Sequence, residues 1–279
     1  MKPIATDHEF ARRTQCALTA NSYPLSAARA ASSPAEIILS KVPLPTHLDS
    51  AEIRSRVARE IRERALFSAR MASMQYLKSL QRVLAAYADG QLNAADARLR
   101  LMGVLDSLGL SEGSNALTDP GSDRRLNLIL QTQKQMAAAV ARIDSQSPAI
   151  LEQWPAWRLT RFGSRREPRT DWLRRWQAAG EAVGWKGAHR RLLVALKSSP
   201  IWEALGRGVG GFQDTLGNPY PPFAYGSGMD WEDVSAEETE RLGLDPTSAH
   251  PQRASLAPDE RDILEAMGRT GLSAKDFAL

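Results

Sequence analysis

Three closely spaced acidic residues, Asp230, Glu232 and Asp233, are the side chains of this sequence best suited to do chemistry. Carboxylates at such short spacing can bind a divalent metal ion or divide the general acid and base roles between them. They also precede Ser235, where a helix is expected to begin, and acidic side chains stabilise the N-terminus of a helix. We interpret the three as structural residues and predict no metal site.

The residues that most often act as nucleophiles, bases or metal ligands are few and scattered. The chain has one cysteine, Cys16, and four histidines, and none has the spacing of a metal site or the context of a nucleophile. Gly206, Gly208 and Gly211 match G-x-G-x-x-G, but they follow a helix-like segment, so we do not interpret them as a dinucleotide loop. The sequence therefore predicts no catalytic residue, no metal and no cofactor.

A group of arginines, Arg165, Arg166 and Arg169, comes directly before Asp171. Guanidinium groups bind phosphate well, which makes Arg165 and Arg166 candidate nucleic-acid contacts. Arginines beside tryptophans also stack on them and pair with carboxylates, which needs no ligand. The charge balance leaves both interpretations open, because residues 151–210 hold twelve basic and five acidic side chains, whereas residues 212–279 hold five and thirteen.

All seven tryptophans lie between Trp154 and Trp231, among prolines, glycines and arginines. Tryptophan and tyrosine are costly to expose and bring large contact areas, so their concentration predicts one densely packed, irregular unit. The candidate chemistry described above falls inside or beside this unit. The remaining elements are expected to position it.

The longest expected element is a helix that begins at Asp49. Asp49 and Glu52 resemble a capping box, and apolar residues then recur along one side as far as Tyr87, before Gly90 ends the helix. Residues 1–48 show little periodicity and several prolines, so we expect them to form an extended arm.

Two further helices are expected in the first half. Asn93 can cap a helix that Gly109 ends, and Asp123, or Ser122 before it, can open a third that continues to Val140. The apolar faces of three successive helices predict that they pack together.

The second half mixes short elements with loops rich in glycine and proline. The expected elements are a strand over residues 157–162, a helix that begins at Asp171, a strand or helical turn over 191–196, a helix over 200–205 that ends at Gly206, a polar helix from Ser235 to Gly243, and an acidic helix from near Ala257.

These elements predict an α+β fold that is mainly α, with a helical N-terminal half followed by a compact module rich in Trp, Pro and Gly with short strands. The expected parts are an arm over 1–48, a helical region over 49–147, the Trp/Pro-rich core module over 148–234 and an acidic helical tail over 235–279. No apolar run reaches the ~18 residues of a spanning helix, and the N-terminus lacks the apolar core of a signal peptide. We expect synthesis in a reducing cytoplasm and no membrane contact.

Several segments taken in order, among them WPAWRLTRF, EPRTDWLRRWQAAG, ALKSSPIWEAL and GNPYPPFAYGSGMDWEDV, resemble bacteriophage head morphogenesis proteins of the phage Mu F-like type. The likeness spans roughly residues 67–244 and makes the core module a Mu F-like one. It implies that a central motif and a later Pro-rich loop are family-motif residues, namely Arg169, Asp171, Trp172, Arg175 and Trp176, and Pro219, Pro221, Pro222 and Phe223. Many relatives carry a Cys and a His near the end of the core, but this chain has no cysteine after Cys16, so a metal or thiol role does not carry over.

The resemblance implies a non-enzymatic minor capsid protein of a phage or prophage, located in the virion at the portal region or inside the procapsid and assembled in the bacterial host cytoplasm. Its partners would be the portal protein or capsid subunits, with packaged DNA as a further candidate and no small-molecule substrate. Two alternatives remain at this point. One is a prophage-borne enzyme, such as a nuclease or toxin, acting through His189 and the acids around Trp231; the other is a simple DNA-binding module.

Overall fold

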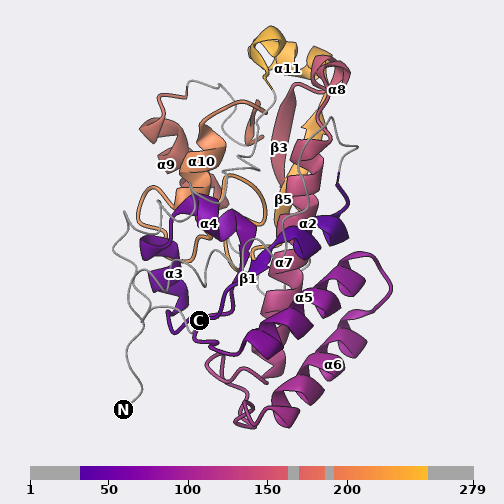
Figure 1. Ribbon diagram of the computed structural model, residues 1–279. Helices are drawn as coiled ribbons and strands as arrows, with labels where there is room; N and C mark the ends of the chain where they lie inside the picture. The colour runs from indigo at the N-terminus through magenta and orange to yellow at the C-terminus, as the bar shows by residue number, and fades with distance from the viewer. Residues whose placement is uncertain (1–31, 163–169, 186–191, 251–279) are drawn as a thin grey trace, which may run out of the picture. The chain divides into compact units, whose positions relative to one another are not determined.

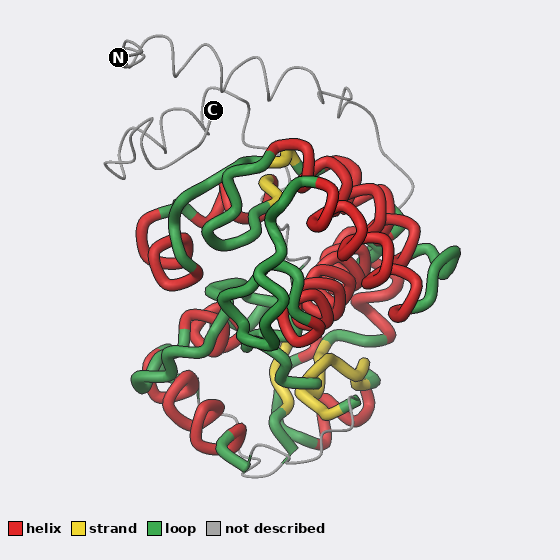
Figure 2. The backbone as a smooth tube through the Cα atoms, turned by 90° about the horizontal axis from the view of Figure 1, so that it is seen from below, coloured by secondary structure: helices red, strands yellow, loops and turns green. Residues whose placement is uncertain are grey.

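The computed structural model describes residues 32–162, 170–185 and 192–250, which fall into two compact units. The first contains the described residues up to Ala137 and the second those from Ala138 onward. Helices make up about half of the described residues and the strands are short (Figure 2). The predicted α+β fold with mainly α structure is confirmed.

In the first unit α5 (Met74–Ala88) contacts both α2 (Pro34–Ser40) and α6 (Ala94–Ser107). Figure 1 shows α5 and α6 side by side. The α6 helix begins at Asn93, whose side chain accepts hydrogen bonds from two backbone amides of the first turn, and Gly109 beyond its end has a positive φ of 65°. The predicted helix between these residues is confirmed.

Residues 32–48, expected to belong to an extended arm, instead contain α2 and strand β1 (Val42–Pro43). A buried glutamine of α5, Gln81, holds this segment in place. The last carbonyls of a helix have no partner within it. The Gln81 Nε2 donates to the carbonyl oxygens at the end of α2 and just beyond, at 3.0, 3.1 and 2.6 Å, in Ile38, Leu39 and Lys41.

The single long helix predicted from Asp49 to Tyr87 is wrong. The segment forms α3 (Ser50–Arg56), α4 (Arg59–Arg64) and strand β2 (Ala65–Leu66) before α5 begins. Strand β2 pairs in parallel with β1, Val42 opposite Ala65. The helical spacing of the apolar residues led to the wrong prediction because Val57 and Ile61 face the same small core, although Val57 has an extended backbone and ends α3. The other buried residues of this core are Leu44, Leu48 and Ala65.

The helix α7 (Asp123–Asp144) begins where the sequence predicts. The loop before it closes around the buried Asp119, whose carboxylate accepts hydrogen bonds from the amides of Glu112, Ser114 and Gly121 at 3.2, 2.7 and 2.8 Å. Burial alone would raise the pKa of Asp119, but these amides outweigh it and hold the pKa below its usual value.

The second unit is built on an antiparallel sheet of three strands in the order β4-β3-β5. The central strand β3 (Ala156–Arg161) pairs with β4 (Val194–Leu196) and β5 (Met229–Val234), which places Trp157 opposite Asp233. The predicted strand over 157–162 is confirmed within one residue. The helices of this unit are the end of α7, α8 (Pro148–Gln153), α9 (Trp172–Ala182), α10 (Ile201–Arg207), α11 (Ala236–Arg241) and the 3-10 helix η1 (Pro246–Ser248).

The glycines that resemble a dinucleotide loop belong to α10 and its end. The predicted end at Gly206 is early, because α10 continues to Arg207 and Gly208 ends it with φ 73°. Gly206 lies inside the helix where the chain folds back closely, and a Cβ there would lie 1.8 Å from the carbonyl oxygen of Asn218. Glycine is therefore required for packing at this position.

Candidate functional site

Four of the residues on which the resemblance rests, Asp171, Trp172, Arg175 and Trp176, lie at the start of α9. Trp172 and Trp176 are one turn apart and buried, as expected for a helix with one face in the core. Asp171 occupies the predicted N-cap position, but its side chain makes no capping hydrogen bond. It accepts from Arg175 Nε at 2.8 Å instead.

Arg175 is the charged centre of this group and is only 5% exposed. Its Nη2 lies 2.8 Å from Asp171 Oδ2 and 2.9 Å from Asp214 Oδ1, and the guanidinium lies 4.3 Å from the ring centroid of Phe212. A buried cation needs paired anions. The arginine of the first motif is thus paired through Nη2 with Asp214, which lies just ahead of the second motif.

The residues of the Pro-rich loop, Pro219, Pro221, Pro222 and Phe223, are all buried. Phe223 has a positive φ of 59°, which is unusual for a residue other than glycine, and its backbone amide donates to the carbonyl of Tyr220 at 3.3 Å. The Ser227 Oγ accepts from the Met229 amide at 3.1 Å, which ties the end of the loop to the start of β5. Packing therefore determines the loop conformation.

Aromatic rings connect the two motifs. Trp157 and Trp231 stack across β3 and β5 with centroids 3.7 Å apart, and Trp202 of α10 lies edge-on to both. The Trp202 ring also lies 5.3 Å from Trp176 of α9 and 6.2 Å from Phe223 of the Pro-rich loop. Trp202 is completely buried and contacts aromatic rings of α9, of the Pro-rich loop and of the sheet. These three parts of the unit therefore pack against one shared side chain.

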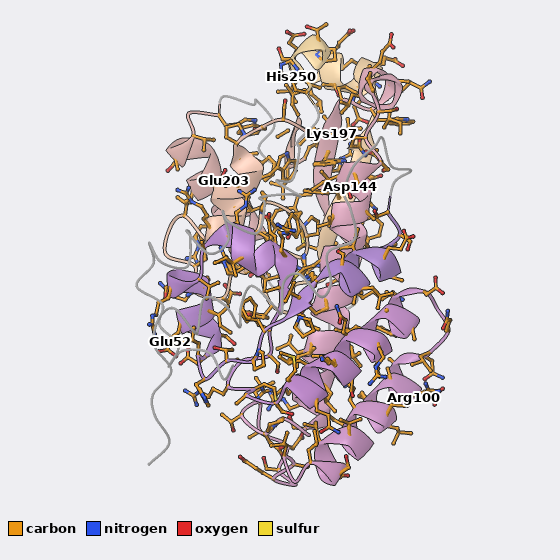
Figure 3. All side chains as sticks on the ribbon, viewed as in Figure 1. Glu52, Arg100, Asp144, Lys197, Glu203 and His250 are labelled. Carbon is orange, nitrogen blue, oxygen red and sulfur yellow. The ribbon has the colours of Figure 1, made fainter. Side chains whose placement is uncertain are left out.

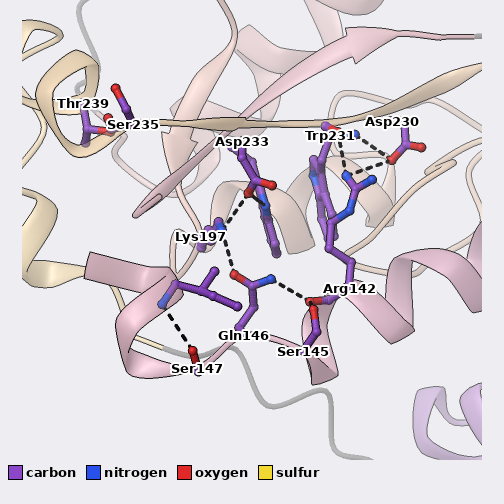
Figure 4. Close-up of polar contacts among 12 residues, drawn as sticks. Arg142, Ser145, Gln146, Ser147, Lys197, Asp230, Trp231, Asp233, Ser235 and Thr239 are labelled. Carbon is purple, nitrogen blue, oxygen red and sulfur yellow. Dashed lines mark hydrogen bonds and ion pairs between the residues drawn. The ribbon is translucent and has the colours of Figure 1, made fainter. Parts of the chain in front are cut away.

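Lys197, just after β4, is a buried cation that the sequence analysis missed. Its side chain is 1% exposed, and Nζ lies 2.7 Å from Asp233 Oδ1 and 2.6 Å from Gln146 Oε1 (Figure 4). The same Asp233 oxygen accepts from Trp157 Nε1 at 3.0 Å. Burial lowers the pKa of Lys197, and the bond to Asp233 partly opposes this shift.

Arg142, in the last turns of α7, extends the same network. Its Nη1 donates to the carbonyl oxygen of Trp231 at 2.6 Å and lies 3.6 Å from Asp230 Oδ1 (Figure 4). The Gln146 amide donates to the Arg142 carbonyl at 2.7 Å and so joins Arg142 to Lys197. Figure 3 shows Lys197 among the side chains of its unit. The network fastens α7 to the sheet.

The acids around Trp231 do not converge on one point. Asp230 and Asp233 are three positions apart on β5 and so point to opposite faces of the strand. Each lies against a different cation, Arg142 and Lys197, and Glu232 lies 3.3 Å from Arg158. Within residues 32–162, 170–185 and 192–250, no three His, Cys, Asp or Glu side chains are grouped to hold a metal ion.

Other predicted residues lie outside the part of the chain that the structure describes. They are Arg165, Arg166, Arg169 and His189. Nucleic-acid contact by Arg165 and Arg166 therefore stays a prediction.

Comparison with protein-family models found no match, and comparisons with curated proteins and with solved structures found none either. Among the described residues, no helix has both the length and the apolar character needed to cross a membrane.

Lys197 could not have been found from its surroundings in the sequence. It lies in the segment ALKSSP, and its two polar partners are 51 and 36 positions away, at Gln146 and Asp233. The segment has neither a motif nor a charge pattern that predicts burial, since lysine is rarely buried.

Proposed function

We propose that this chain is a minor capsid or head morphogenesis protein of a phage or prophage, which binds the portal protein or capsid subunits during head assembly. It would then be located in the virion, at the portal or in the capsid interior, with packaged DNA as a further candidate partner. The proposal starts from the resemblance of the two motifs to the phage Mu F-like type.

One observation carries the proposal furthest. The segments that bear the resemblance are about 40 positions apart, and they pack into one module through the Arg175–Asp214 ion pair and the contacts of Trp202 with Trp176 and Phe223. Their packing together supports the interpretation that they are parts of a single inherited unit.

The chemistry of the module supports a function based on contact. Its buried charged side chains, Arg175 and Lys197, are held by Asp171, Asp214 and Asp233 within the unit. Charges paired in this way are enclosed within the unit, and recognition of partners would fall to the outer surface. No specific contact in the described residues favours the nuclease, toxin or DNA-binding alternatives over this function.

The experiment is a binding measurement with the portal protein of the phage that encodes the chain. Purified full-length chain and portal protein are mixed and separated by size-exclusion chromatography. We expect co-elution, with the peak of the free chain reduced as portal protein is added. Capsid protein of the same phage is tested in parallel, and failure of the chain to co-elute with either protein at concentrations of about 10 μM would count against the proposal.

A further inference from the structure

A surface groove lies between α8, α11 and η1 of the second unit, outside the network of Lys197 and the aromatic cluster. Its volume is about 580 Å³, within the range of ~300–1,000 Å³ that is usual for ligand sites. Figure 1 shows α8 and α11 next to each other. The groove is lined by Pro148, Leu151, Glu152, Ala236, Glu240, Pro246, Thr247 and Ala249.

The walls of the groove are held by local capping and by one longer bond. Ser147 caps α8 with Pro148 in its first turn, and Asp245 caps η1 with Pro246 in its first turn. The Ser198 hydroxyl donates to the Ser248 carbonyl at 3.0 Å and fastens η1 to the segment after β4. The groove is therefore formed before any ligand binds, which lowers the entropy cost of binding.

The lining is mostly apolar and its charged groups have one sign. Leu151 is only 5% exposed, whereas Glu152 and Glu240 are exposed and have no basic partner among the described residues. The neighbouring acid Glu237 does not line the groove and lies 3.9 Å from Arg241. Such a lining is complementary to an aliphatic side chain flanked by positive charge.

We propose that this groove binds a short peptide segment of a partner protein, in which an aliphatic side chain is flanked by arginine or lysine. The aliphatic group packs against the apolar lining formed by Leu151, Pro148 and Pro246, and the basic groups pair with Glu152 and Glu240. The chain's own residues 251–279 follow the groove in sequence and have four basic and five acidic side chains, but they also place Leu272 between Arg269 and Lys275, so their binding in the groove is the competing outcome of the test below. Only the identity of the partner, a portal or capsid subunit, rests on the proposed function.

The test uses fluorescein-labelled octapeptides in which one leucine is flanked by two arginines at several spacings. Fluorescence anisotropy with the full-length chain should show saturable binding for at least one spacing. The Glu152→Gln, Glu240→Gln double variant should bind it roughly 10-fold more weakly, because two exposed ion pairs are lost. The matched control Glu237→Gln removes an exposed acid of the same helix that does not line the groove, and it should bind as the wild type does.

Three outcomes would overturn the groove proposal: no saturable binding below about 1 mM, equal binding of peptides with glutamate in place of arginine, or equal loss of binding in the Glu237→Gln control. Blockage of the groove by residues 251–279 would give the first of these. The proposed function is tested separately, because the wild-type chain can be sought in phage heads whatever the peptides do. If the chain binds the peptides but is absent from phage heads, the groove proposal stands and the proposed partner, a portal or capsid subunit, is contradicted.

Discussion

Lys197 Nζ lies 2.7 Å from Asp233 Oδ1, with the lysine side chain 1% exposed and the aspartate side chain 42% exposed. The pair joins the segment after β4 to β5, and Gln146 joins both to the end of α7. A buried cation that loses its anion keeps its desolvation cost without compensation. The pair is therefore a stability determinant of the second unit.

Asp233→Ala should lower the free energy of unfolding of the second unit by about 2 kcal/mol, less than for a completely buried pair, because Gln146 still accepts from Lys197. Urea unfolding followed by tryptophan fluorescence measures this, since all seven tryptophans lie between residues 154 and 231. The control Glu232→Ala removes an exposed partner of Arg158 and should cost under about 0.5 kcal/mol. Adding Lys197→Met to Asp233→Ala should restore part of the loss. Equal effects of Asp233→Ala and Glu232→Ala would contradict the assignment.

Arg175→Lys should destabilise the second unit by about 2 kcal/mol, although the charge is kept, because an ammonium group cannot reproduce the planar contacts of a guanidinium. In the native chain the Arg175 guanidinium forms ion pairs with Asp171 and Asp214 and lies against the ring of Phe212. The neighbouring Arg174 is exposed, and Arg174→Lys should change the stability by less than about 0.5 kcal/mol. Both are measured by the same tryptophan-detected unfolding, and a similar small effect at both positions would refute the bridging role of Arg175.

Gly206→Ala should strongly destabilise the chain, by about 3 kcal/mol or more, because the new methyl group meets a backbone carbonyl that cannot rotate away. Gly103 is a helical glycine of α6 with nothing within 4 Å of its Cβ position. Gly103→Ala should therefore stabilise by up to about 1 kcal/mol. Thermal unfolding followed by circular dichroism distinguishes the expected destabilisation by Gly206→Ala from the expected stabilisation by Gly103→Ala. A Gly206→Ala protein as stable as the wild type would show that α10 and residue 218 are not packed as described.

Lys41 provides a prediction on pH. Burial lowers its pKa from 10.5 to about 8, against the attraction of Glu63, and its Nζ donates to Gln133 at 3.1 Å. Between these values the unfolded chain binds more protons than the folded one, so the contribution of Lys41 to stability rises with pH from about 8 to 10.5. Below pH 8 the charged amine lowers the free energy of unfolding by about 3 kcal/mol relative to the neutral amine. This value follows from the difference between the two pKa values, 10.5 − 8 = 2.5.

Lys41→Met should consequently raise the free energy of unfolding at pH 7 by about 2 kcal/mol, after about 1 kcal/mol is subtracted for the lost hydrogen bond. The advantage should shrink as the pH approaches 10. Urea unfolding followed by circular dichroism at pH 7 and 9.5 tests this, with the exposed Lys78→Met as the control. An advantage of Lys41→Met that is the same at both pH values would contradict the assigned pKa.

Local signals in the sequence were sufficient for elements with their own start and stop residues. The helix between Asn93 and Gly109 and the strand from Trp157 were predicted because capping, apolar spacing and turn residues all lie within the segment. The α3–α5 region was mispredicted because its break depends on the pairing of Val42 with Ala65, far apart in the sequence. No local pattern specifies such a contact.

In the candidate site, too, contacts within one helix follow from the local sequence, whereas contacts between distant segments do not. Burial of Trp172 and Trp176 follows from their helical spacing, and the Arg175–Asp171 pair from an i, i+4 relation. The bonds of Arg175 to Asp214 and of Lys197 to Gln146 and Asp233 join segments that meet only in the folded unit. Their residue types are ordinary, so only the three-dimensional arrangement reveals them.

The most direct test of the central proposal is the protein content of phage heads. Heads of the phage that encodes this chain are purified through a density gradient, treated with protease to remove attached host proteins, and quantified by mass spectrometry. We predict that the chain is retained in the heads at a constant ratio to the portal protein, in far fewer copies than the major capsid protein. Heads and procapsids that contain portal protein but none of this chain would contradict the account.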